Sequence, residues 1–383
     1  MEENMKKKNV KKQFFLVLIF VIIILIISSL LFPKQKKINN VSYSINFTKS
    51  NLGTKLEAYI KDSSYEADIL KADGNKTIYG VINDTLENGN LFLTKGLFLY
   101  DIESEELKYY EFNEYSRVID FIIFDNKIYQ VILENDTEDS SIKWKIQVQE
   151  LNNSISWIVK EGTLIDVFKY PRLFIEDDNL YITTLTNFEK NSEGYAKEKY
   201  SLSKIENNVL KELISYEGSL IKEEGILAYN IMNVKIENSI FYHTIVDENS
   251  IQRLMAYNIK NKENKEIKSN DSKNLILYSY IPIKNSMYIQ YAYKNQTNRA
   301  KFEFDSKINE SELNTFENKI NKDCILFHNT GNRWYIYDTS NNKYIKLSNN
   351  RNNFYPKYIV LGENTILTED FENNYYIGKI ERN

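Results

Sequence analysis

Two histidines and one glutamate are the side chains whose type and spacing could support chemistry in this 383-residue chain. His243, His328 and Glu369 each follow the first apolar residue of a β-rich segment by three positions. Two imidazoles and a carboxylate form a common ligand set for a transition metal. His243 and His328 belong to segments two repeats apart, however, too far for metal–ligand bonds of about 2 Å. We therefore expect no metal and no cofactor, and keep the three residues as candidates for ligand binding.

Other reactive groups give no catalytic signature. Cys324 is the only cysteine and lies in an apolar run, so it forms no internal disulfide and is expected to be buried as a small hydrophobic side chain. Clusters of acidic residues lack the alternating ligands and glycine of a calcium loop, and are typical of solvated turns. No glycine-rich phosphate loop or serine nucleophile elbow occurs. A glycan-cleaving pair of carboxyl groups contributed by distant segments remains open.

One short pattern recurs along most of the chain and must position any site. In 125–133 a polar turn (Asp125, Asn126) leads into a run of β-branched and aromatic residues, as expected for a strand that leaves a tight turn. Related segments begin 37 to 60 residues apart, and their first apolar residues are Leu91, Ile128, Leu180, Ile240, Met287, Ile325 and Ile366. The fold class is therefore all-β.

A second pattern lies inside each unit. An aromatic-rich strand ends in a polar turn and is followed by another apolar stretch, as at Tyr100 with Asp101 and at Tyr337 with Asp338. Each unit is thus predicted to be a meander of four strands. The segment 311–320 is expected to form a short helix or a loop. Tyrosines within the strands are expected to fill the core, whereas aromatic residues assigned to loops, including Trp157 and Tyr355, could form a binding face.

The units resemble β-propeller repeats in general, because their average spacing is close to the roughly 40 to 50 residues of a blade. The resemblance implies seven four-stranded blades over 41–383. The last unit ends after its third strand, and the segment 41–47 alternates like a strand, so we expect the N-terminal strand to close the ring. No repeat signature of a particular propeller family is present. A pair of β-sandwiches and a ring of six or eight units remain alternatives.

The N-terminal segment has the features of a membrane anchor. Residues 1–13 carry five lysines, and residues 14–32 carry no charge. Nineteen helical residues span about 28 Å, close to the roughly 30 Å of a hydrocarbon core. A cleaved signal peptide is the alternative, but no small-x-small site follows. We expect a cytoplasmic tail (1–13), a transmembrane helix (14–32), a linker (33–40) and an extracytoplasmic domain (41–383), oriented by the lysine excess before the span.

The charge of the chain limits the classes of partner that it can bind. Residues 38–383 carry a net charge of −10, which disfavours nucleic acid and other polyanions. Apart from the lipid bilayer around 14–32, the expected partner is a protein or an envelope glycan. The predicted function is a membrane-anchored binding or scaffold module without catalytic activity. The alternative is a membrane-tethered glycan hydrolase or lyase whose carboxylates lie on the face of the central channel.

Overall fold

The computed structural model describes most of the chain from residue 41 onwards. The described segments are 41–60, 64–73, 77–85, 92–135, 142–151, 155–164, 170–190, 196–206, 209–219, 222–223, 226–227, 234–246, 251–272, 274–293, 296–304, 307–311, 315–329 and 332–383. The predicted tail, transmembrane helix (14–32) and linker (33–40) lie outside them. Within these segments, no helix has both the length and the apolar character needed to cross a membrane.

The chain divides into two compact units, Tyr43–Glu381 and Met1–Ser42 with Arg382–Asn383, and the site described below lies within the former. Strands dominate this unit. The first sheet has seven strands in chain order, β2 (Tyr65–Asp73), β3 (Thr77–Thr85), β4 (Phe92–Asp101), β5 (Leu107–Phe124), β6 (Lys127–Asn135), β7 (Ile142–Glu150) and β8 (Ser156–Leu164). Its long strand β5 pairs with β4 through its first part and with β6 through its second part.

Four antiparallel four-stranded sheets follow along the chain, each with its strands in sequential order. They are β9 (Arg172–Glu176), β10 (Asn179–Lys190), β11 (Ala196–Glu206) and β12 (Val209–Ser219); β15 (Lys235–Glu237), β16 (Ile240–Val246), β17 (Gln252–Asn258) and β18 (Asn264–Asn270); β19 (Leu275–Ile283), β20 (Ser286–Tyr293), β21 (Gln296–Phe304) and β22 (Lys307–Ser311); and β23 (Thr315–Lys319), β24 (Cys324–Asn329), β25 (Trp334–Asp338) and β26 (Lys343–Lys346). A two-stranded pair, β13 (Lys222–Glu223) and β14 (Ile226–Leu227), lies between the first and second of these along the chain.

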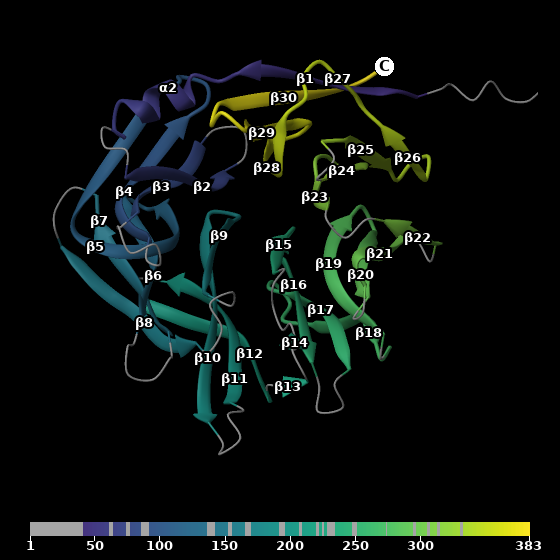
Figure 1. Cartoon of the computed structure of the whole chain (residues 1–383). Helices are drawn as coiled ribbons and strands as arrows, with labels where there is room; N and C mark the ends of the chain where they lie inside the picture. The colour runs from purple at the N-terminus through teal and green to yellow at the C-terminus, as the bar shows by residue number, and fades with distance from the viewer. Residues whose placement is uncertain are drawn as a thin grey trace, which may run out of the picture. The chain divides into compact units, whose positions relative to one another are not determined.

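The remaining sheet has five strands and joins both ends of this unit. Its order is β27 (Ser348–Asn349), β1 (Tyr43–Lys49), β30 (Tyr375–Arg382), β29 (Thr365–Asp370) and β28 (Phe354–Gly362). Strand β1 therefore lies beside β30 as the outer strand that the last unit lacks, which confirms the prediction for 41–47. A short helix, α2 (Leu52–Glu57), follows β1 (Figure 1) and buries Leu52 and Leu56.

The predicted hairpins are confirmed where two successive turn residues take positive φ. Asp125 (50°) and Asn126 (57°) precede β6, and Asp177 (47°) and Asp178 (54°) precede β10. Two left-handed residues in a row make the turn whose twist matches antiparallel strands, and Asp and Asn accept this conformation more readily than most residues. The polar dipeptides therefore set where these second strands begin.

The first hairpin was placed wrongly. Phe92 and the aromatic run ending at Tyr100 belong to one ten-residue strand, β4, which is the third strand of its unit; the second strand is β3. The pairing of β4 shifts register between Thr94 and Gly96, so a bulge rather than a turn interrupts the apolar pattern. A Cβ on Gly96 would lie 2.6 Å from the Tyr110 carbonyl oxygen, which explains the glycine.

The segment 311–320 was also wrongly predicted. Its described part forms the end of β22 and strand β23, which pairs antiparallel with β24. Two of the aromatic residues assigned to loops were likewise misplaced, because Trp157 lies in β8 and Tyr355 in β28. Strand tyrosines do fill the core as expected, since Tyr129, Tyr288 and Tyr337 are each at most 2% exposed.

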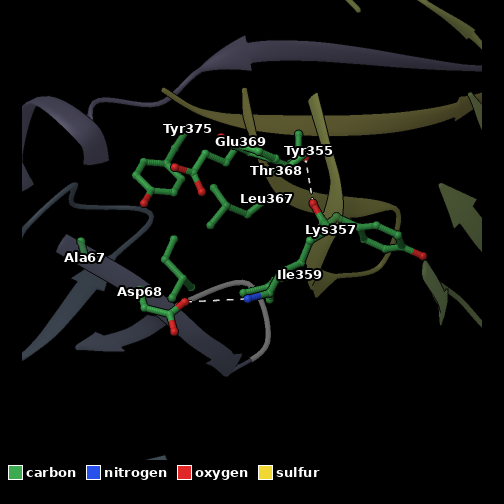
Figure 2. Close-up of a pocket in the computed structure, with 11 residues that line it drawn as sticks. Ala67, Asp68, Tyr355, Lys357, Ile359, Leu367, Thr368, Glu369 and Tyr375 are labelled. Carbon is green, nitrogen blue, oxygen red and sulfur yellow. Dashed lines mark hydrogen bonds and ion pairs between the residues drawn. The ribbon is translucent and has the colours of Figure 1, made fainter. Parts of the chain in front are cut away.

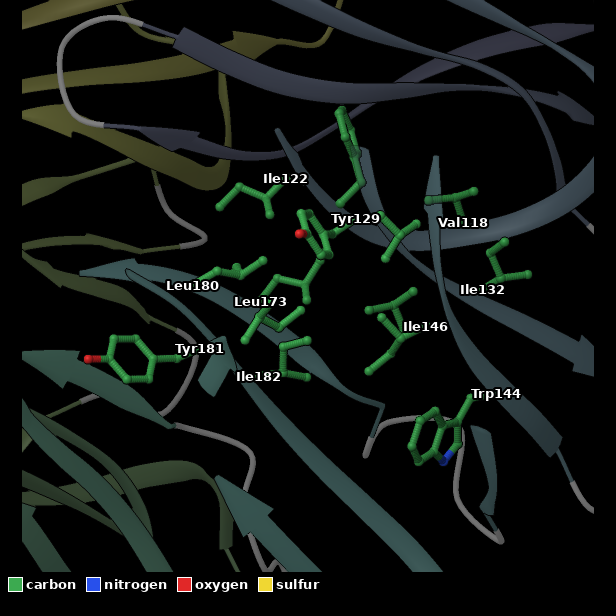
Figure 3. Packing of buried hydrophobic residues seen from close by; sticks show 14 of the residues in the cluster. Val118, Ile122, Tyr129, Ile132, Trp144, Ile146, Leu173, Leu180, Tyr181 and Ile182 are labelled. Carbon is green, nitrogen blue, oxygen red and sulfur yellow. The ribbon is translucent and has the colours of Figure 1, made fainter. Parts of the chain in front are cut away.

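The largest apolar core lies between neighbouring sheets (Figure 3) and includes Tyr129 of β6, Trp144 of β7 and Leu180 of β10. The buried Trp144 indole donates a hydrogen bond of 3.0 Å to the Leu185 carbonyl of β10, which ties the two sheets together. Strands of different sheets also contact one another, β5 with β9, β9 with β15, β19 with β23, β23 with β28 and β28 with β2. The last sheet thus packs against the first, as in a propeller.

Strand β1 is held from several directions. It pairs in parallel with β27, and the Asn350 side chain bonds both the Phe47 amide (2.9 Å) and the Phe47 carbonyl (3.3 Å). The Tyr43 hydroxyl donates to Asp338 Oδ2 at 2.9 Å, at the end of β25 in the preceding sheet. The Phe47 ring packs against Phe354 of β28 at 4.3 Å between centroids. Strand β1 therefore connects the last two sheets.

Candidate functional site

His243 lies in β16 and is fully buried among aromatic rings. Its ring stacks on Phe241 with the centroids 4.7 Å apart and lies 4.9 Å from Tyr216. Burial lowers the pKa of His243 to about 4, so its imidazole is neutral at pH 7. The residue contributes to packing between sheets and has no access to a ligand in this arrangement.

His328 has a comparable environment in β24. Its ring stacks almost parallel on Trp334 at 3.7 Å, and Nε2 lies 3.2 Å from the side-chain oxygen of Asn332. Burial lowers the pKa of His328 to about 4. The thiol of Cys324, in the same strand, is also buried, which raises its pKa above the usual range. Neither group is poised for proton transfer or nucleophilic attack near pH 7.

The structure does not bring the three predicted residues together. In the described part of the chain, no three His, Cys, Asp or Glu side chains lie close enough to hold a metal ion. The three residues do occupy the second strands of their sheets, β16, β24 and β29, as their common spacing predicts. Glu369 of β29 lines a cavity.

The cavity beside Glu369 is formed where β2 of the first sheet meets β28 and β29 of the last sheet (Figure 2). Its volume is about 210 Å³. The lining residues are Ala67, Asp68, Ile69, Tyr355, Lys357, Tyr358, Ile359, Leu367, Thr368, Glu369 and Tyr375. Strands β2 and β28 lie at the edges of their sheets and contact one another, and the cavity lies beside this contact. We refer to it as the Glu369 pocket.

The Glu369 carboxyl group is the unusual element of this pocket. No hydrogen bond or ion pair joins it to any other described residue, and Figure 2 shows it between Tyr375 and Leu367. Burial raises the pKa of Glu369 to about 7, and the nearby Asp68 and Asp370 carboxylates act in the same direction against the opposing charge of Lys357. Glu369 therefore exchanges a proton near neutrality, which a solvated glutamate does not.

Its neighbours are already paired with one another. Lys357 Nζ lies 3.7 Å from Asp68 Oδ1, and the Thr368 hydroxyl donates to the Lys357 carbonyl at 3.2 Å. Asp370, next in sequence to Glu369, accepts hydrogen bonds from the amides of Glu372 and Asn374 and an ion pair from Arg351 at 3.2 Å. Lys357 and Arg351 thus pair with Asp68 and Asp370, and the Glu369 carboxyl group has no ion pair with a described residue.

Two exposed aromatic rings lie beside the pocket. Tyr355, which lines it, is 38% exposed, and Phe371, which follows β29, is 58% exposed. Their rings meet edge to face with centroids 4.7 Å apart. Large aromatic residues exposed together are typical of binding surfaces, because each offers a rigid apolar area. The pocket therefore combines an apolar wall, an accessible acid and an aromatic edge.

A second charged group joins three other sheets, through β15, β20 and β23. The Lys319 ammonium of β23 bonds the Glu237 carboxylate of β15, and the Tyr288 hydroxyl donates to Glu317 Oε2 at 2.9 Å. Burial raises the pKa of Glu317 to about 7 and lowers that of Lys235 to about 8. Opposite charges face one another here, so the group is a linkage between sheets.

Sequence reasoning identified Glu369 and Tyr355 but not Asp68, Lys357 or Phe371. Asp68 lies about 300 residues before Glu369 along the chain, and only the meeting of the first and last sheets brings them to one pocket. A local pattern contains no signal for this contact. The alternation of Tyr355 with Lys357 on β28 is the one feature that could have marked a pocket wall.

Comparison with known proteins supports the fold. No family model and no curated protein sequence matches the chain. The β-propeller domain of the Trilobed protease from Pyrococcus furiosus, described as having an open velcro topology, aligns over 84% of this chain and 95% of that chain at 11% identity and a TM-score of 0.50. Pyrococcus horikoshii acylaminoacyl peptidase aligns at 10% identity and a TM-score of 0.50, over 82% of this chain but 50% of the peptidase.

A third match, the WD40 domain of SCAP from fission yeast, aligns over 83% of this chain and 98% of that chain, at 9% identity and a TM-score of 0.41. At these identities the similarity concerns the fold alone. Together with the antiparallel four-stranded sheets, the similarity to the propeller domain of the Trilobed protease shows a β-propeller-like fold and confirms the resemblance drawn from the repeats.

Proposed function

We propose that the protein is a membrane-anchored, extracytoplasmic β-propeller that binds another protein or an envelope component without catalysis. The observation that supports this function most directly is the Glu369 pocket, an open cavity edged by the exposed Tyr355 and Phe371 rings. The other reactive side chains considered from the sequence, His243, His328 and Cys324, are buried in the core. A rigid scaffold that presents one such pocket is suited to recognition.

The blade number forms part of the proposal. Strand β5 acts as the fourth strand of one blade through its pairing with β4 and as the first strand of the next through its pairing with β6. The seven-stranded sheet then contains two blades, and β28, β29, β30 and β1 form the last, for seven in all. A crystal structure of the protein tests the count, and six or eight blades would refute it.

The anchor rests on the uncharged segment 14–32 and its flanking lysines. We expect the full-length protein to remain in the membrane fraction after an alkaline carbonate wash. External protease should degrade its C-terminal domain in cells whose cytoplasm is sealed. Release into the soluble fraction, or protection of the domain, would contradict the proposed location.

The binding function is tested by site-specific photo-crosslinking in intact envelopes. A photoreactive amino acid at Tyr355 should yield discrete cross-linked products, because this residue lies at the pocket. The matched control is Tyr344 of β26, which is also exposed (44%) but lies in a different sheet. The same products from both positions, or none from Tyr355, would count against recognition at this pocket.

A glycan hydrolase or lyase is the second candidate, favoured by the presence of two carboxyl groups, Asp68 and Glu369, in one pocket. Glycosidases pair a protonated acid with an ionised carboxylate, and the raised pKa of Glu369 suits the former role. Turnover of envelope glycans by the purified protein, abolished in both Asp68→Asn and Glu369→Gln, would support catalysis. Turnover unaffected by these substitutions would exclude this pair.

A further inference from the structure

We infer that the Glu369 pocket receives the side chain of a lysine presented by a basic segment of a partner protein. This inference rests on the proposed binding function and specifies its ligand. Three features support it: a carboxylate without a hydrogen bond or ion pair to any other described residue, apolar walls behind it, and an exposed aromatic pair at the edge of the pocket.

The Glu369 carboxyl group forms no ion pair with a cation among the described residues, although the charge of Lys357 acts on it. It also has no hydrogen bond with any other described residue. Lys357 lies 3.7 Å from Asp68, and Arg351 lies 3.2 Å from Asp370, so both nearby cations already have acidic partners. An arriving ammonium would find an acceptor that the protein itself leaves open, and a charged hydrogen bond in a partly desolvated site is strong.

The walls fit the remainder of a lysine side chain. Ala67, Ile69, Ile359 and Leu367 line the pocket with methyl and methylene groups. A lysine buries its four-carbon stem along such a surface while its charged end reaches a polar partner. An engineered cavity of about 150 Å³ accepts benzene, and the Glu369 pocket, at about 210 Å³, is larger. A neutral sugar would instead leave many of its hydroxyl groups facing apolar walls, at a cost in free energy.

The surroundings favour a segment of protein over a free amine. Tyr355 and Phe371 offer exposed apolar area at the edge of the pocket, where residues flanking the inserted lysine would lie. The net charge of −10 over residues 38–383 attracts a basic partner over a distance set by the ionic strength. Lysine anchoring thus uses both the pocket and the charge of the whole domain.

The test uses the full-length protein in detergent and the peptide acetyl-Ala-Lys-Ala-amide, with ligand-observed NMR as the readout. We expect saturable binding that weakens at least roughly tenfold when the lysine carries an Nε-acetyl group, because the charge is lost. Glu369→Gln keeps the shape of the side chain and should weaken binding of the unmodified peptide by the same factor. The matched control, Glu363→Gln, alters an exposed glutamate in the turn between β28 and β29 and should leave the affinity unchanged.

Measuring the peptide affinity as a function of pH shows whether Glu369→Gln acts by removing the negative charge or by altering the shape of the pocket. The ionisable groups that face Glu369 are Asp68, Lys357, Asp370 and Tyr375. As the pH rises through about 7, Glu369 ionises while the peptide lysine stays charged, so the affinity should rise in the wild type and stay level in Glu369→Gln. Equal affinity for the acetylated peptide, or the same pH profile in both proteins, would overturn the inference.

The outcomes also separate the ligand from the function. If Tyr355 gives discrete cross-links but Glu369→Gln does not change the affinity for the peptide, lysine is not the ligand of the pocket. The proposed binding function would still hold. Specific binding of a neutral envelope oligosaccharide in place of the peptide would have the same meaning. Peptide binding that depends on Glu369, without any cross-linked partner in envelopes, would instead support the pocket chemistry and contradict the proposed recognition in the cell.

Discussion

Two carboxylates at junctions between sheets show how the same chemical group serves different ends. Asp120 of β5 is 4% exposed and accepts hydrogen bonds from Lys71 Nζ of β2 (2.6 Å) and from the Leu173 amide of β9 (2.9 Å). Glu369 of β29 lies at the junction with β2 and has no such partner among the described residues. Asp120 joins strands β2, β5 and β9, whereas Glu369 has no hydrogen-bond partner among the described residues.

Asp120 and Glu369 differ in how much stability the folded protein would lose if each were substituted. A buried carboxylate that accepts hydrogen bonds from its neighbours fixes their positions. Its removal leaves an ammonium group and a backbone amide without a hydrogen-bond acceptor. A carboxylate that satisfies nothing contributes little to the folded state and is available to a ligand. Completeness of hydrogen bonding, more than burial alone, therefore distinguishes a structural acid from a candidate binding acid in this protein.

Removing strand β1 should have the largest effect, because β1 completes the sheet that carries Glu369 and connects it to the preceding sheet. Deletion of residues 41–48 exposes the partners of the buried Tyr43, Ile45 and Phe47, each worth about 1.5–3 kcal/mol of burial. We expect a loss of several kcal/mol, measured as a sharp drop in the thermal unfolding midpoint. The control, Asn46→Ala with Thr48→Ala, changes exposed positions of the same strand and should shift the midpoint little. An undiminished midpoint after the deletion would contradict closure by β1.

Substitution of Asp120 should be the next largest effect and should leave the pocket intact. Asp120→Asn removes the negative charge opposite Lys71 and turns an acceptor into a mixed donor and acceptor beside the Leu173 amide. We expect a loss of about 2–3 kcal/mol in the free energy of unfolding by urea. Asp68→Asn is the matched control, because its ion pair with Lys357 is exposed and worth less than about 1 kcal/mol. Equal losses of unfolding free energy in Asp120→Asn and Asp68→Asn would contradict a structural role specific to Asp120.

The smallest expected effect is a change in how stability depends on pH. The folded state holds the Glu369 proton more tightly than the unfolded chain, since the pKa rises from 4.5 to about 7. Its contribution to stability is therefore present at low pH and lost as the pH rises from about 4.5 to about 7. The thermal midpoint should fall less over this range in Glu369→Gln than in the wild type. Parallel pH profiles in the two proteins would contradict the raised pKa.

Comparing each variant with the wild type removes the contributions of other groups. Glu317, whose pKa is also raised to about 7, lowers stability over the same pH range. His243 and His328, with pKa values lowered to about 4, act in the opposite direction, because the unfolded chain binds protons more readily between about pH 4 and 6.5. These effects are common to both proteins and cancel in the difference.

The repeating hairpins were predictable because their information is local. Pairs such as Asp125 with Asn126 fix a turn, and the alternating residues that follow fix a strand. The prediction failed where a bulge at Lys95 and Gly96 interrupted β4, since a polar residue beside a glycine resembles a turn. It failed again at 315–319, where charged side chains such as Glu317 and Lys319 find their partners on strands distant in the chain.

The candidate site was only half predictable for a similar reason. Glu369, His243 and His328 were selected because they occupy the same position in their repeats. The position does not show whether a side chain lines a pocket or packs in the core, because its surroundings depend on which sheet lies opposite. His243 faces the rings of Phe241 and Tyr216, whereas Glu369 faces the cavity beside β2. Contacts between distant segments decide the role, and one sequence does not contain them in readable form.

The pairing of β1 with β30 also bears on how the domain is made. About 330 residues separate the two strands, so β1 leaves the ribosome long before its neighbour exists. During that interval the apolar side chains Tyr43, Ile45 and Phe47 lack the residues against which they pack in the folded domain. The backbone of β1 is also unpaired and can form hydrogen bonds with other nascent chains. Such a distant pairing is slow to form. Biogenesis of this protein should therefore depend on factors that shield the early strand until synthesis reaches the late one.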